Sequence, residues 1–300
     1  MSPIFFKFFD ISNSNIYEKR ECENGGIVFK KKFNKIQSVL KEKKLWYSMP
    51  QYFNDPFDCN YSISMSDSEW LEILRKSFSL LDEKFKKLHP QLTPEEISTK
   101  SSSAMKARIN PQDFLERITH NTTICSFVST TEQEKKDFLK SNSISMWSHY
   151  AGNHQGFLIE FNNRHGNIVK NLEEISYSDN FSKINYHEFE AYIELLKGND
   201  NKVVLKELWT KIYLRKHKTW HIENEWRDIR RYEKGVQSYG QEIPFISKDI
   251  KAIYLGCQIK HKDKEEIMNV LTENYETKPK LFEMSKIRGE YGLQQNEICY

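Results

Sequence analysis

A short segment in the C-terminal third of the chain carries two carboxylates and a guanidinium at alternate positions. Residues 220–227 read WHIENEWR, so Glu223, Glu225 and Arg227 follow one another at intervals of two. In a β-strand these three side chains would project from the same face. Burying them unpaired would be costly, so the pattern indicates either a site for electrostatic or acid chemistry or a solvated sheet face with Glu–Arg pairs.

The sequence FNDPFD at residues 53–58 is a second candidate, and it follows an expected strand at 45–48. Asn and Asp beside a proline favour a turn, because their short side chains bond to nearby backbone while proline fixes φ. Two interpretations stay open. The segment is either a capped turn anchored by two phenylalanines or a loop that shapes a pocket, in which Asn54 or Asp55 bonds a ligand.

The third candidate is the run SMWSHYAGNHQG at residues 145–156, which holds two histidines five positions apart. That spacing does not place both histidines on one helical turn, so it gives no indication of a metal site. We expect His149 and Tyr150 either to contact a ribose or a base, or to lie in the core with one polar tip bonded.

The composition argues against several classes of partner. The net charge over 300 residues is +3 and the lysines are spread along the chain, so no concentrated phosphate-binding stripe is visible. Five scattered cysteines form no C-x-x-C pair, which fits a reducing cytoplasm and no zinc site. No apolar stretch approaches the roughly 20 residues that span a bilayer. We therefore expect a cytoplasmic protein without a membrane partner.

The elements that must position these residues alternate between strand and helix. Hydrophobic spacing predicts strands at 5–9, 45–48, 122–128, 156–161, 252–256 and 278–284, and helices at 33–40, 188–196, 203–217 and 265–274. Ser66 and Glu69 form a capping box that opens a helical insertion at about 64–120. We predict a single α+β domain over 1–287, with a mixed or antiparallel β body, followed by a polar tail at 288–300.

Four blocks in this order resemble a widespread bacterial family of uncharacterised function. They are Phe6-Lys7-Phe8, then FNDPFD, then MWSHYAGNHQGFLIEF, and then K-x-W-x-x-E-x-E-x-R, which begins at Lys218 and includes Trp220. An apolar strand ending in Gly256 follows, as in that family. Members usually carry tyrosines and an arginine in the first strand, where this chain has phenylalanines.

More distantly, the layout resembles the ADP-ribosyltransferase superfamily. The resemblance implies a split β sheet with a helical lobe and NAD as the substrate, bound in a cleft. It also implies that Glu225 stabilises the oxocarbenium-like state as nicotinamide leaves, while Glu223 orients the acceptor. Arg227 would position these acids or bind phosphate, and His149 and Tyr150 would contact ribose or nicotinamide. Asn54 and Asp55 would line the cleft, and Lys218 and Trp220 would bind substrate.

The expected function is therefore an NAD-cleaving enzyme that acts as a toxin or phage-defence effector on an unknown macromolecular acceptor or on water. One alternative is a nuclease-like effector that holds a divalent metal with Asp55, Asp58, Glu223 and Glu225. Another is a sensor or binding module without catalysis. That reading predicts that Glu225 pairs with Arg227, Arg230 or Arg231 in a closed sheet with no cleft beside it.

Overall fold

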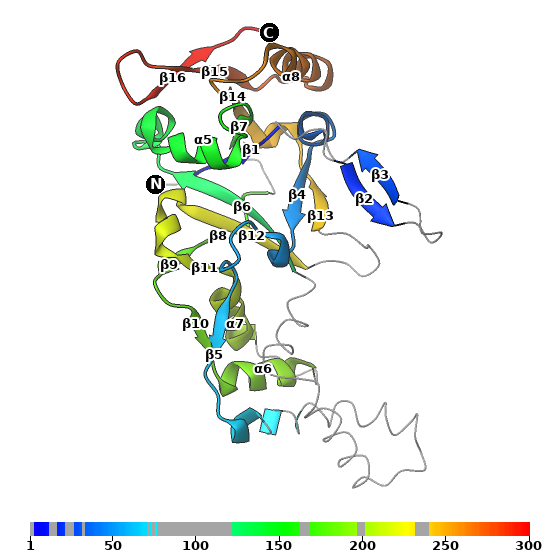
Figure 1. Cartoon of the computed structure of the whole chain (residues 1–300), viewed down its shortest axis with the longest axis vertical. Helices are drawn as coiled ribbons and strands as arrows, with labels where there is room; N and C mark the ends of the chain where they lie inside the picture. Colours follow the sequence, from blue (N-terminus) through cyan, green and yellow to red (C-terminus); the bar gives the residue numbers. More distant parts are fainter. Residues whose placement is uncertain are drawn as a thin grey trace.

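The structure is a computed structural model that describes residues 3–11, 17–21, 27–31, 34–70, 72–73, 76, 122–162, 168–196, 202–231 and 240–300. Its body is one large sheet with helices on both faces, and a smaller lobe extends from one end (Figure 1). The N-terminal strand and the C-terminal strands belong to this body, so the chain begins and ends on the same sheet.

Ten strands from the described part of the chain form the large sheet, in the order β13-β4-β6-β1-β7-β14-β15-β16, with β12 on the other edge of β6 and β8 beyond it. Only β14 and β15 pair in parallel; the other neighbours are antiparallel. The strands are β1 (Ile4–Phe9), β4 (Lys44–Ser48), β6 (Thr122–Thr130), β7 (Phe157–Phe161), β8 (Glu173–Glu174), β12 (Glu225–Arg231), β13 (Gly240–Pro244), β14 (Ile250–Leu255), β15 (Lys280–Lys286) and β16 (Leu293–Glu297). The α+β class with a mostly antiparallel open sheet is confirmed.

Three two-stranded pairs and several helices complete the described chain. The pairs are β2 (Tyr17–Glu21) with β3 (Ile27–Lys31), β5 (Tyr61–Ile63) with β10 (Ser182–Ile184), and β9 (Ser176–Ser178) with β11 (Arg215–His217). The α-helices are α4 (Lys135–Asp137), α5 (Ile144–Tyr150), α6 (Tyr186–Leu196), α7 (Lys202–Tyr213) and α8 (His261–Asn274). The π-helical turns are η1 (Ile36–Lys41) and η3 (Phe138–Asn142), and the 3₁₀ helices are η2 (Pro50–Tyr52), η4 (Lys218–Glu223) and η5 (Ser247–Asp249).

The large sheet divides at β6. One edge of β6 pairs with β12 along its length, from Val128 to Thr122. The opposite edge pairs with β1 near Val128 and with β4 only at Ile124. Two different strands, β1 and β4, therefore pair with different stretches of one edge of β6.

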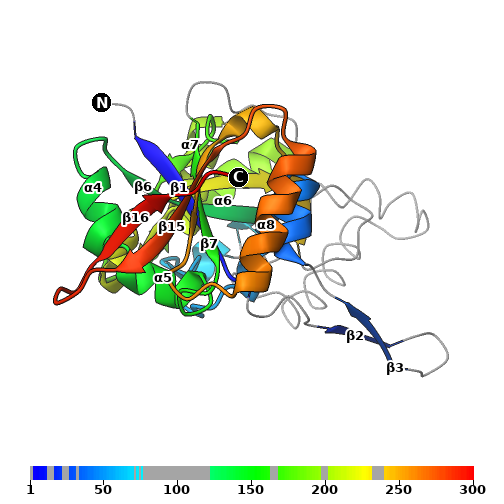
Figure 2. The ribbon, with the colours of Figure 1, turned by 90° about the horizontal axis from the view of Figure 1, so that it is seen from above.

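Alternation along β1 builds the two hydrophobic layers on either side of the sheet. Phe5 and Phe9 pack in the cluster that includes η1 and α8, whereas Phe6 and Phe8 pack with α5 and η3 on the other face. Figure 2 shows α8 on one side of the sheet and α4 and α5 on the other. β1 consists almost wholly of apolar aromatic residues and is buried on both faces. Such a strand belongs in the interior of the sheet, and β1 does lie there, between β6 and β7.

A third hydrophobic cluster holds the smaller lobe together. Most of its members come from β5, β10, α6 and α7, and they include Phe189 and Leu208, which are both almost fully buried. Ile124 of β6 also belongs to it, so the lobe packs against the end of the large sheet where β6 begins. β9 and β11 lie between the lobe and the sheet (Figure 1).

The structure departs from the expected elements at three places. The predicted helix at 203–217 ends at Tyr213, and residues 215–217 form strand β11 instead. Glu223 lies in a 3₁₀ helix and not on the strand that carries Glu225. The polar tail at 288–300 contains β16, which pairs with β15. Ser66 does cap a helix with Glu69, but residues 71, 74–75 and 77–120 of the expected insertion lie outside the described residues.

Gly156 allows three elements to meet at the start of β7. A Cβ atom at this position would lie 1.9 Å from the carbonyl oxygen of Phe9 and 3.0 Å from that of Ala151. Its own carbonyl accepts from Gly256 N at 2.9 Å, where β14 ends. Because the crowding atoms are backbone, they cannot move aside as a flexible side chain would.

We therefore predict that Gly156→Ala lowers the free energy of unfolding by about 1–3 kcal/mol, the usual cost of overpacking a close contact. Urea denaturation followed by tryptophan fluorescence measures this change. Gly292→Ala is the matched control, because the nearest atom to its Cβ is the flexible Ile287 Cδ1 at 3.1 Å. Equal losses in the two variants would contradict the prediction.

Candidate functional site

A residue with left-handed backbone conformation, Asn224, brings Glu223 and Glu225 together. Asn224 has φ of 41° and ends η4, and β12 begins at the next residue. Asn tolerates this conformation better than other residues with a Cβ, and its side-chain amide donates to Ser129 O at 2.8 Å. The predicted shared strand face holds for Glu225 and Arg227 but is wrong for Glu223, which reaches the same place from the preceding 3₁₀ helix.

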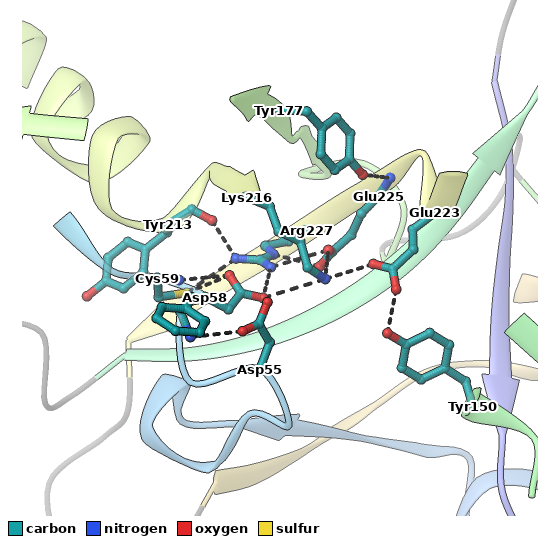
Figure 3. A network of polar contacts seen from close by, with 11 residues as sticks. Asp55, Asp58, Cys59, Tyr150, Tyr177, Tyr213, Lys216, Glu223, Glu225 and Arg227 are labelled. Atoms are coloured by element: carbon teal, nitrogen blue, oxygen red, sulfur yellow. Dashed lines mark hydrogen bonds and ion pairs between the residues drawn. The ribbon is translucent and has the colours of Figure 1, made fainter. Parts of the chain in front are cut away.

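Two buried cations tie three carboxylates into one network (Figure 3). Lys216 Nζ donates to Glu223 at 2.7 Å and to Glu225 at 2.9 Å, and it lies 3.6 Å from Asp58. Arg227 donates from Nε to Glu225 at 2.6 Å and from Nη2 to Asp58 at 2.6 Å. Each of the five side chains is 7% exposed or less. Three carboxylates therefore face two cations with almost no water.

Aromatic residues enclose this network. The hydroxyl of Tyr150, at the end of α5, donates to Glu223, and Tyr177 on β9 accepts from Glu225 N at 2.8 Å. The Arg227 guanidinium lies over the Phe53 ring at 5.5 Å, and Lys216 Nζ lies over Trp220 at 5.0 Å. The rings keep water away, so the charges act on one another in a medium of low polarity.

The two glutamates have opposite pKa shifts. Burial raises the pKa of Glu223, and the attraction of Lys216 only partly offsets that effect. Burial also opposes ionisation of Glu225, but the charges of Arg227 and Lys216 outweigh it, so the pKa of Glu225 falls below its ordinary value. Burial raises the pKa of Tyr150, which keeps its hydroxyl protonated as a donor.

Two cavities adjoin the network, and Lys216 lines both of them. The smaller has a volume of about 140 Å³, and both Glu223 and Glu225 lie on its wall. The larger has a volume of about 460 Å³. The remaining walls of the smaller are Phe6, Lys7, Phe8, Phe53, Asn54, Asp58, Ser126, Phe127, Val128 and Tyr150, and those of the larger are Asp55, Phe57, Asn60, Ser178, Asp179, Asn180, Phe181, Arg215, His217, Thr219 and Trp220.

Most of the residues singled out in the sequence converge here. Glu223, Glu225, Arg227 and Tyr150 belong to the network, Asn54 lines the smaller cavity, and Asp55 and Trp220 line the larger one. Two residues lie outside.

His149 is exposed and contacts the edge of the Tyr150 ring, with the two centroids 6.2 Å apart. Lys218 is 62% exposed and pairs with Asp179 at 2.8 Å, on the rim of the larger cavity. Neither side chain contacts the buried carboxylates.

Sequence reasoning missed Lys216 and Lys7 as members of the site. The hydrophobic spacing predicts a helix through Lys216, whereas the structure places it on a strand beside Tyr177 through the parallel pairing of β11 with β9, which no local pattern indicates. Lys7 donates to Ser126 O at 2.8 Å where β1 leaves β6, and it lines the smaller cavity. A lysine within a strand of aromatics was the one signal that could have identified it.

The described residues contain no group of three or more His, Cys, Asp and Glu side chains arranged to hold a metal ion. Between the acids of the candidate site lie Lys216 and Arg227, which already supply the positive charge that a divalent metal would bring. As for a membrane, no described helix has both the length and the apolar character needed to span one.

Residues 146–227 match the model of a protein family described as a protein of unknown function (DUF2971). The match begins within α5 and ends at Arg227, so it covers the MWSHYA block, Lys216 and both glutamates. It fits the expected resemblance to a family of uncharacterised function. No curated protein and no solved structure matches the chain.

We predict that Lys216→Met lowers the free energy of unfolding by about 3–5 kcal/mol, because it leaves carboxylates buried without their cation. The same change two residues later, Lys218→Met, removes an exposed ion pair and should leave stability unchanged. Chemical denaturation of both variants measures the difference. A loss at Lys216 no larger than that at Lys218 would show that the network contributes little.

The opposite pKa shifts predict opposite pH dependences. Glu225 has a lowered pKa, so it contributes stability above the ordinary glutamate pKa of about 4.3 and loses it as the pH falls. Glu223 has a raised pKa, so its contribution is present at low pH and is lost as the pH rises. Between pH 6 and pH 3, the stability of wild type relative to Glu225→Gln should fall, and its stability relative to Glu223→Gln should rise. Parallel curves for the two variants would contradict the assignment.

Proposed function

We propose that this protein cleaves NAD at the bond between nicotinamide and ribose and transfers ADP-ribose to a macromolecule or to water. The observation that carries the proposal is the pair of glutamates on one cavity wall with opposite pKa shifts. Two acids whose environments separate their pKa values are suited to two different roles in one reaction.

Glu225 takes the role that needs a permanent negative charge. Its lowered pKa keeps it ionised, and its bonds to Lys216 and Arg227 hold the carboxylate in one orientation. As the C–N bond breaks, the bonding electron pair leaves with nicotinamide and positive charge develops on the ribose. A fixed carboxylate beside that ribose stabilises the developing charge without having to reorganise.

Glu223 takes the role that needs a proton acceptor. Its raised pKa makes it a better base than an ordinary glutamate, and it lies on the same cavity wall. When an acceptor hydroxyl or water attacks the ribose carbon, Glu223 accepts the proton that is released. Tyr150, bonded to Glu223, orients that carboxylate.

The superfamily and the cellular role of the protein are part of the same proposal. An open sheet that divides at β6, with the acids beside the division, supports a likeness to ADP-ribosyltransferases. An enzyme that consumes NAD or modifies a cellular target stops growth, so we place it as a cytoplasmic toxin or phage-defence effector. Arg227 then acts as a positioning residue for Glu225, since it is fully buried and does not line either cavity.

A non-enzymatic binding module is the second candidate, because the pairing of Glu225 with Arg227 at 2.6 Å is what that alternative expected. It also expected no cleft beside Glu225. The cavity on which Glu225 lies favours the enzyme.

The test measures the release of nicotinamide from NAD by chromatography, with and without cell lysate as a source of acceptors. We predict that Glu225→Gln lowers the rate by about 10²–10³-fold, as expected when a preorganised electrostatic contact is lost. Glu276→Gln, an exposed glutamate, is the control and should leave the rate unchanged. No release by folded wild-type protein in either condition would refute the proposal.

A further inference from the structure

The larger cavity shares Lys216 with the buried network, and most of its other walls come from residues outside that network. The turn after β9 supplies Asp179 and Phe181, β11 supplies Arg215, and the loop before β5 supplies Asp55 and Phe57. Its volume of about 460 Å³ lies within the range of about 300–1,000 Å³ that is usual for small-molecule sites. It is therefore large enough for a nucleotide-sized ligand.

Arg215 brings to this cavity a positive charge that forms no ion pair among the described residues. Its Nη2 donates to Ser178 Oγ at 2.7 Å, its buried Nε has no hydrogen-bond partner, and among the described residues it pairs with no carboxylate. Asp179 pairs with Lys218 at 2.8 Å, and Lys216 pairs with the buried glutamates. Asp55, the other carboxylate of this wall, accepts from Phe57 N at 2.9 Å. A guanidinium that pairs with no carboxylate at a cavity wall favours an anion, and phosphate oxygens match its geometry.

Two exposed aromatic side chains lie on the same cavity. Phe57 is 64% exposed and Phe181 is 44% exposed, which places them among the most exposed large apolar side chains of the described chain. Exposed rings at the mouth of a cavity favour a flat apolar ligand that stacks on them. Asp55 adds a carboxylate that can accept hydrogen bonds from sugar hydroxyls.

We infer that this cavity binds a nucleoside diphosphate, with the base on Phe57 and Phe181, the ribose hydroxyls at Asp55 and the phosphates at Arg215. The inference deepens the proposed function and rests on it for the choice of adenine as the base. Lys216 lines both cavities, so in this proposal the ADP half of a dinucleotide lies in the larger cavity and its second ribose is directed toward the Lys216 wall that the smaller cavity shares. The substrate is thus bound mainly by its non-reacting half.

Isothermal titration calorimetry with ADP, adenosine and inorganic phosphate tests the inference on the full chain. We predict that ADP binds more tightly than adenosine or phosphate alone. Arg215→Ala and Phe181→Ala should each weaken ADP binding by about 10-fold or more, the usual effect of losing a charged phosphate contact or a stacked base. Arg288→Ala and Tyr291→Ala are the matched controls, since both residues are exposed in the β15–β16 connection and should leave affinity unchanged.

Folding of each variant is checked by its thermal melting temperature. Phe181 lies outside helices and strands and its side chain is exposed, so its variant tests the stacking even if Arg215→Ala is unstable. Absence of ADP binding by folded wild type overturns the inference, and so does ADP binding that both variants leave unchanged. Adenosine binding as tightly as ADP overturns the phosphate contact.

The same experiment separates this inference from the proposed function. Wild type that binds ADP through Arg215 but releases no nicotinamide from NAD supports the nucleotide site and refutes NAD cleavage. Release of nicotinamide with a KM that Arg215→Ala does not change supports cleavage and overturns the inference.

Discussion

Lys216 and Arg227 form ion pairs with three carboxylates in a place that water hardly reaches. Removing a charged group from water costs several kcal/mol, so each of these side chains is tolerated only while its partners are in place. The partners come from the loop before β5, from β11, from η4 and from β12. The ion pairs of this network therefore connect the loop that leads into the smaller lobe with β12 of the large sheet.

The backbone on both sides of this cluster adopts a conformation that residues with a Cβ rarely use. Cys59, next to Asp58, has φ of 55°, and Asn224, between the two glutamates, has φ of 41°. Such residues cost free energy and are retained where the surrounding structure fixes them, which is often at functional sites. Asp58 and Glu223 are therefore placed by strained turns as well as by their ion pairs.

The sequence predicted well what depends on neighbouring residues. Strands and helices with clear hydrophobic spacing, such as β1 and α8, lie close to where the pattern placed them. The strand assignment of Glu223 was wrong because one left-handed asparagine ends the 3₁₀ helix after it. β16 was missed because only Leu293 of this strand is buried, so it lacks the alternation that marks an inner strand. Lys216 lies at the site because β11 pairs with β9, which is distant in the sequence, so local spacing could not predict its position.

The ion pair between Asp58 and Arg227 joins residues 169 positions apart in the chain. During synthesis at about 5–20 residues per second, Asp58 precedes its partner by roughly 10–30 s. A chain still on the ribosome, or one cut short before β12, has Asp58 but no guanidinium to bury beside it. The network is thus completed only after β12 has been synthesised, and a shorter product carries the Asp58 loop without its Arg227 partner.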